Sequence, residues 1–138
     1  MSWQDFPKLE LHLHLEGAAP PAFVRDLAKR RHVDISRAFN ENGGYAFHDF
    51  GHFLQVYEAA TSVLKTPEDY AALTRAVLDT LEAQGVVYAE TFVSPDFCGG
   101  RDLAAWRDYV AVMAEVCQAR AARGGPDLRA IVTCIRHF

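Results

Sequence analysis

Two histidines, His12 and His14, are the residues whose type and spacing best suit chemistry. They lie in Leu9–Gly17, where apolar and polar residues alternate strictly, which is the period of a β-strand. Side chains two positions apart on a strand project from the same face, roughly 6.5–7 Å from each other. Neutral imidazole nitrogens bind zinc at about 2.0–2.1 Å, so this pair can share one metal ion.

The spacing alone is weak evidence for a metal site, because the six histidines of this chain give a chance His-x-His pair roughly 0.26 times per chain. The rest of the run strengthens the interpretation. We expect one face to be buried against helices, namely Leu9, Leu11, Leu13 and Leu15, and the other to carry Glu10, His12, His14 and Glu16. In a closed barrel this polar face would point inward, where unpaired polar groups are costly. We therefore favour a metal site; a half-exposed edge strand with a solvated polar face is the alternative.

Helical and strand periods alternate along the rest of the chain. Helices are predicted after Pro20, Asp49 and Thr66 and over 103–117, the third closed by Gly85, and strands over 9–17, 86–93 and 128–135. This order is typical of parallel α/β folds. Three parallel strands leave faces and edges uncovered. We interpret residues 1–138 as the first part of one larger barrel or doubly wound domain, whose free edges favour self-association of the fragment.

The composition excludes several functional classes. A formal net charge of −4 and a pI near 5.8 provide no basic surface for nucleic acid or for an anionic membrane. The sequence has no apolar run long enough to span a bilayer and no signal peptide at its start. The three cysteines are odd in number and widely spaced, which does not suggest a disulfide framework. We expect a cytoplasmic protein.

The eleven residues Pro7–Gly17 resemble the opening motif of the adenosine and adenine deaminases, in the metal-dependent amidohydrolase superfamily. Fainter likeness continues through Phe53–Leu54, 85–90, Ser94–Pro95 and 136–138. The resemblance implies the N-terminal portion of a (β/α)8 TIM barrel, with its site at the C-terminal mouth of the strands. It also implies one zinc ion per complete site, which activates water to attack C6 of a purine with loss of ammonia.

Within this resemblance, His12 and His14 match the first two zinc ligands, and His14 also borders the substrate. Glu16 falls where the family places a substrate-contacting carboxylate, and Phe53 and Leu54, followed by Tyr57, resemble an apolar gate over the purine. On spacing alone, Phe47, Phe50, Phe53 and Tyr57 fit a buried core at least as well as a gate.

The family's third histidine, its metal-binding aspartate and its proton-shuttling glutamate all lie beyond Phe138. This chain therefore contains no catalytic residue of its own, and we expect it to be inactive alone. His137 is expected to be structural, and Cys98 lacks the basic neighbours that activate a thiolate.

The expected substrate is a small purine, with adenosine as the main interpretation and adenine as the alternative. Glu16 and Phe92 stand where many adenosine deaminases have aspartate and arginine, which favours adenine, whereas Ser94–Pro95 resembles the adenosine type. Two rivals remain. A metal-dependent phosphoesterase also begins with His-x-His, although its usual continuation differs from Leu15–Gly17. A truncated barrel could instead act as a non-catalytic module.

Overall fold

The structure is a computed structural model that describes residues 2–136. Along the chain its elements are η1 (Trp3–Asp5), β1 (Lys8–His14), α1 (Pro21–Arg30), η2 (Ser36–Ala38), α2 (Phe50–Ser62), α3 (Pro67–Ala83), β2 (Val86–Val93), α4 (Leu103–Ala122) and β3 (Asp127–Val132). The predicted order of strands and helices is confirmed. The prediction for His137 lies outside the described residues. Within 2–136, no helix is long and apolar enough to cross a membrane.

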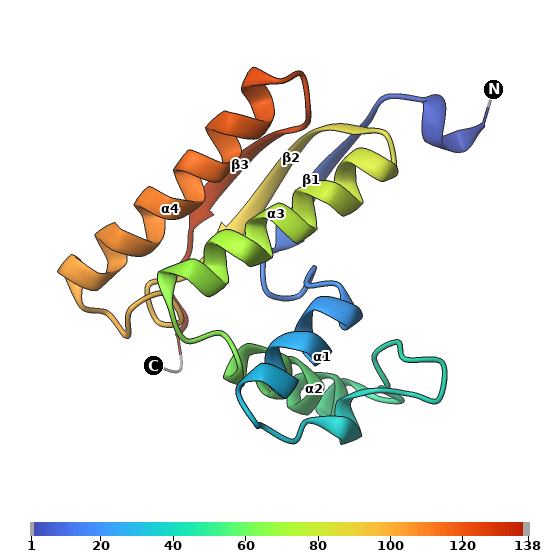
Figure 1. Ribbon diagram of the computed structural model, residues 1–138, viewed down its shortest axis with the longest axis vertical. Helices are drawn as coiled ribbons and strands as arrows, with labels where there is room; N and C mark the ends of the chain where they lie inside the picture. The colour runs from blue at the N-terminus through green and yellow to red at the C-terminus, as the bar shows by residue number, and fades with distance from the viewer. Residues whose placement is uncertain (1, 137–138) are drawn as a thin grey trace.

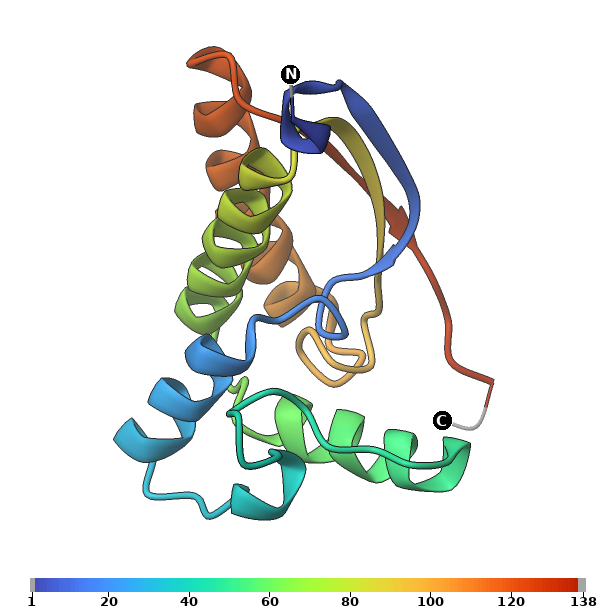
Figure 2. The same ribbon diagram turned by 90° about the vertical axis from the view of Figure 1, so that its right-hand side faces the viewer.

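The three strands form one parallel sheet in the order β1-β2-β3, so β2 is central and the other two are edges. The helices α3 and α4 lie side by side over one face of this sheet (Figure 1). In the turned view the opposite face is open, and α1 and α2 lie at the C-terminal end of the strands (Figure 2). The sheet therefore has one covered face, one open face and two free edges.

The first strand differs from its predicted pattern. It ends at His14 rather than Gly17, and three residue steps from Glu10 to Leu13 match two steps on β2, which marks a β-bulge. The expected burial holds for two of the four leucines: Leu15 is buried in the turn after the strand and Leu13 packs partly buried against the core. It is wrong for Leu9 and Leu11, which are 63% and 56% exposed. The physical reason is that β1 is an edge strand, and α1, the next helix, lies at the end of the sheet (Figure 2).

The core lies between the covered face of the sheet and the two long helices. Its members include Leu73, Val77 and Leu78 of α3, Tyr109 and Met113 of α4, and Ala89 and Val93 of β2. The apolar residues of α4 lie only partly in this core. A groove of about 530 Å³ separates α4 from β3, lined by Trp106, Val110, Met113 and Cys117 on the helix and Leu128, Ala130 and Val132 on the strand. Apolar side chains of α4 therefore border a groove beside a free sheet edge.

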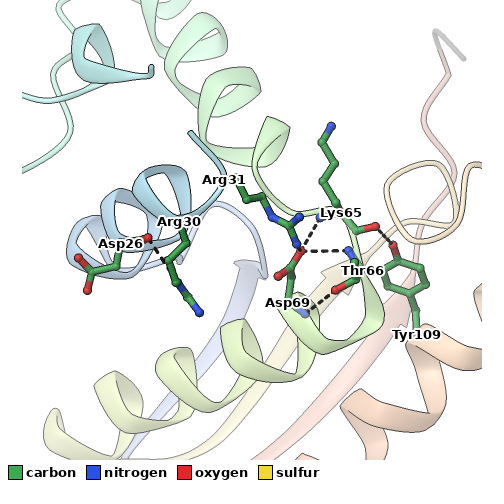
Figure 3. Close-up of polar contacts among 7 residues, drawn as sticks. All are labelled: Asp26, Arg30, Arg31, Lys65, Thr66, Asp69 and Tyr109. Carbon is green, nitrogen blue, oxygen red and sulfur yellow. Dashed lines mark hydrogen bonds and ion pairs between the residues drawn. The ribbon is translucent and has the colours of Figure 1, made fainter. Parts of the chain in front are cut away.

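The start of α3 joins three segments through the carboxylate of Asp69 (Figure 3). This carboxylate forms an ion pair with Arg31 at the end of α1 and accepts hydrogen bonds from the backbone amides of Lys65 and Thr66, at 2.8 and 3.0 Å. In return, the Asp69 amide donates to the Thr66 hydroxyl, so the predicted N-cap is a complete capping box. The Tyr109 hydroxyl of α4 donates to the Lys65 carbonyl at 2.9 Å. The connection between the two helical layers is thus polar and specific.

Replacing Asp69 by alanine should lower the free energy of unfolding by about 3 kcal/mol, because the change leaves a partly buried guanidinium and two amides without their acceptor. Glu68→Ala is the matched control, since Glu68 is an exposed carboxylate in the same first turn and should cost less than about 1 kcal/mol. Urea unfolding followed by circular dichroism measures both. Equal losses in the two variants would contradict the role given to Asp69.

The free edge of β3 should make the 138-residue chain self-associate, because unpaired strand edges pair with other chains. Val132→Lys should shift the chain toward monomer, since Val132 is 60% exposed on this edge strand and an edge lysine opposes pairing. Leu103→Lys, at a 62% exposed position where α4 begins, is the control. Size-exclusion chromatography with light scattering gives the masses. A monomeric unmodified chain, or equal shifts in both variants, would rule out association through this edge.

Candidate functional site

His12 and His14 lie together at the C-terminal end of β1, with both rings against Phe92 of β2. Phe92 alternates with the buried Thr91 and Val93, so these rings lie on the sheet face opposite the core. The ring centres of the two histidines are 5.5 Å apart, so the prediction that they share a face is confirmed. Both side chains are exposed. The ring of Phe92, whose Cα is the register partner of His14 on β2, lies 4.9 Å from the His12 ring and 5.1 Å from the His14 ring. Three rings therefore form one cluster.

The geometry of this pair fits a shared metal ion. Two imidazoles that hold one tetrahedral ion through bonds of about 2.0–2.1 Å have ring centres roughly 5 Å apart. The separation of the His12 and His14 rings, 5.5 Å, is close to this value. Among residues 2–136 there is no group of three or more His, Cys, Asp or Glu side chains that could hold a metal. The described residues thus bring together two potential nitrogen donors, one fewer than the three protein ligands that a catalytic zinc ion takes.

Glu16 is not on the open polar face where the alternating pattern put it. It follows the strand, in a turn where the Ala18 amide donates to the His14 carbonyl at 2.9 Å, and only 4% of it is exposed. Its two carboxylate oxygens accept hydrogen bonds from the Tyr57 hydroxyl at 3.3 Å and the Tyr70 hydroxyl at 2.9 Å. Because β1 ends at His14, the strand alternation stops before Glu16 and the carboxylate turns inward.

Burial dominates the electrostatics around Glu16. Removal from water raises the pKa of this carboxyl, and the hydrogen bonds from Tyr70 and Tyr57 and the nearby His14 act in the opposite direction. The pKa of each tyrosine is also raised, by burial first and then by the neighbouring carboxylate. Tyr70 lies on the buried face of α3. Helical spacing marks a buried residue but carries no information about the partner of its hydroxyl.

The aromatic residues of α2 border this site, and their interpretation as core is wrong. Phe47, Phe50 and Phe53 are exposed and Leu54 is half exposed, whereas α2 buries Val56 and Ala60. Asp49 caps the helix as predicted, accepting from the His52 amide at 2.8 Å. Tyr57, one helical turn after Phe53, connects these exposed aromatic residues to Glu16.

The Tyr57 ring lies 6.2 Å from the ring of Phe53 and 6.3 Å from that of Phe97. Gly17 lets this ring come close, because a Cβ at that position would lie 3.2 Å from Tyr57 Cε2. The structure therefore places Phe53 next to the residue that contacts Glu16, while Leu54 lies beside it in sequence on the same exposed helix.

The loop after β2 completes the surroundings of the site. Cys98 is fully buried, and burial together with the nearby Glu16 raises its pKa to about 12, which excludes an activated thiolate. Asp96 accepts from the Ser94 hydroxyl at 2.9 Å and the Ile135 amide at 3.3 Å and pairs with Arg101 at 2.9 Å. These bonds fix the loop to the segment after β3, which is a structural role.

Comparison with known proteins identifies the family of the chain. The family model described as adenosine deaminase matches residues 7–138. An adenine deaminase of Rhizobium johnstonii is 42% identical over 132 residues, which are 95% of this chain and 40% of that protein. The chain thus spans about two fifths of the length of the curated relatives that it matches.

Two solved structures are also similar. The adenine deaminase of Arthrobacter aurescens superposes with a TM-score of 0.65 at 26% identity, over 90% of this chain and 38% of that one. An amidohydrolase of Burkholderia ambifaria with bound zinc gives a TM-score of 0.70 at 23% identity, over 94% and 36%. The solved deaminases are TIM-barrel enzymes, so the predicted fold, three parallel strands and helices of the N-terminal portion of a (β/α)8 barrel, is confirmed. The chain belongs to the adenosine deaminase family.

Proposed function

We propose that this chain is the N-terminal part of a metal-dependent purine deaminase that hydrolyses adenine, releasing ammonia. The observation that carries the proposal is the His12–His14 pair, exposed at the C-terminal end of a strand with its ring centres 5.5 Å apart. Barrel enzymes keep their active sites at that end of the strands. The deaminases that the chain matches provide the reaction class.

Adenine takes the place of adenosine as the leading substrate for two reasons. The curated relatives at about 40% identity are named adenine deaminases. In addition, both oxygens of Glu16 already accept tyrosine hydroxyls and the residue is almost fully buried, so little of it is accessible to a ribose hydroxyl. Adenine has no ribose and therefore needs no carboxylate partner for a ribose hydroxyl. Adenosine remains the alternative that the assay below tests.

The described residues have distinct parts in this proposal. His12 and His14 would hold a zinc ion as two neutral imidazoles. When bound, zinc supplies Lewis acidity, which makes a water nucleophilic enough to attack C6 near neutral pH. Phe53 and Leu54 would border the purine and exclude water from it, and Glu16 would fix the polar end of the pocket through Tyr57 and Tyr70.

The remaining ligands, and the acid–base group that moves protons to the leaving amine, would come from the longer protein. The proposal includes a cytoplasmic location, because the reducing cytoplasm keeps cysteines such as the three free ones of this structure as thiols. A small-molecule purine is the proposed partner of the site, with no nucleic acid or membrane involved.

The full-length protein should release ammonia from adenine with a kcat/KM that exceeds the value for adenosine by about tenfold or more, a ratio that one unmatched group in a pocket can supply. His14→Ala should abolish deamination, because it removes one of two ligands on β1. His32→Ala, which changes an exposed loop histidine, is the control and should keep the unmodified rate. A preference for adenosine would reverse the substrate assignment, and normal activity in His14→Ala would refute the metal role.

The 138-residue chain alone should contain close to no zinc after dialysis, because catalytic zinc takes three protein ligands and residues 2–136 bring only two together. Elemental analysis of the purified chain measures this directly. His12→Ala, with one donor fewer, provides the baseline. Near one zinc per chain would show that a further ligand exists, from a second copy or from a residue not placed in the site.

A further inference from the structure

The two imidazoles of the site are held in an unusual way. Neither His12 nor His14 has a side-chain hydrogen bond or ion pair with another residue of 2–136; the bonds at these residues involve their backbone atoms. Histidine ligands in metal sites are normally oriented by a polar group that accepts their second N–H. Here the close neighbour of both rings is the aromatic ring of Phe92, at 4.9 and 5.1 Å.

Phe92 is well placed to orient them. It lies on β2, the strand with hydrogen-bonded neighbours on both sides, and its Cα is in register with His14 on one side and Ile131 on the other. Its carbonyl accepts from the Leu15 amide at 3.3 Å, which fixes the chain just after the second histidine. An edge strand thus carries the two donors, and the central strand carries the ring against which they pack.

The β-bulge in β1 contributes to the same arrangement. It falls between Glu10 and Leu13 and so includes His12. Bulges turn side chains away from the direction that a regular strand would give them. The rings of His12 and Phe92 lie 4.9 Å apart although His14, and not His12, is the register partner of Phe92. The bulge brings the first histidine onto the ring that already contacts the second.

We propose that Phe92 is the positioning residue of the metal pair: its ring holds the two imidazoles in orientations from which both nitrogens reach one ion, in place of a hydrogen-bonding partner. This inference rests on the proposed function in one respect, that His12 and His14 are metal ligands. Removing the ring leaves two exposed imidazoles free to turn about their side-chain bonds, so binding must then order them and is weaker.

The test uses the 138-residue chain and Cu²⁺, the first-row divalent ion that nitrogen donors hold most tightly. Cu²⁺ is titrated into the unmodified chain, Phe92→Leu, Phe92→Tyr and the double variant His12→Ala/His14→Ala, with calorimetry for affinity and electron paramagnetic resonance for nitrogen coordination. Phe92→Leu keeps an apolar side chain without the ring, and Phe92→Tyr keeps the ring. Circular dichroism melting confirms that each variant is folded.

The expected result is one site with two nitrogen ligands that the double variant lacks. Phe92→Leu should weaken it about tenfold, the lower end of what partners that orient histidine ligands contribute, and Phe92→Tyr should restore it. Unchanged affinity in Phe92→Leu overturns the inference and leaves the proposed function intact. No binding above the double variant overturns it as well. Binding that depends on Phe92 in this chain, with no purine deamination by the full-length protein, would refute the proposed function alone.

If Phe92→Leu does not fold, a second measurement on the unmodified chain tests the inference. In the unmodified chain, ring-current shifts from Phe92 should move the carbon-bound ring protons of His12 and His14 away from the positions shown by His32, which is exposed. Proton–carbon NMR of the histidine rings reads this without any metal. Ring protons at the positions of free histidine would show that the imidazoles do not pack on Phe92, and the inference would be wrong.

Discussion

A buried carboxylate next to the strand end governs the arrangement of the site. Glu16 has little contact with water, and burying such a group is costly unless its oxygens find donors. The donors are the hydroxyls of Tyr57 on α2 and Tyr70 on α3, which are 41 and 54 positions away in sequence. The turn after β1, the helix at the mouth of the sheet and the first helix on its covered face are therefore bound to one another at a single point.

Asp69, the neighbour of Tyr70 in sequence, fixes the same part of α3 to a further segment. Asp69 and Tyr70 are adjacent at the start of α3: the first receives Arg31 of the α1 end, and the second donates to Glu16. Residues 15–65, which leave the sheet and return to it, are thus held at both ends by the first turn of one helix. That turn is itself fixed by its capping box and by Tyr109 through the Lys65 carbonyl. Tyr57 of α2, which contacts the Phe53 ring, is held at the strand end through its bond to the same Glu16 carboxylate.

Local features of the fold could be predicted from the sequence, and long-range ones could not. The N-caps at Asp49 and Thr66, the end of α3 at Gly85 and the strand over 86–93 depend on neighbouring residues, and the structure confirms them. The bulge in β1 depends on register with a strand far along the chain. The end of β1 at His14, after which Glu16 turns off the histidine face, depends on the same pairing. The partners of Glu16 and the exposure of the α2 aromatics depend likewise on where helices settle in space, which periodicity does not specify.

The incomplete donor set and the uncovered surfaces have a common physical cause. The open sheet face, the edges at β1 and β3 and the groove beside α4 all lack the strands and helices that close a barrel. The histidines lie on that open face, against Phe92. In a closed barrel, the strands that cover Leu9, Leu11 and Val132 would also enclose His12, His14 and Phe92. Further strand ends would then bring donors to the same mouth. Completion of the core and completion of the proposed metal site would therefore be one event.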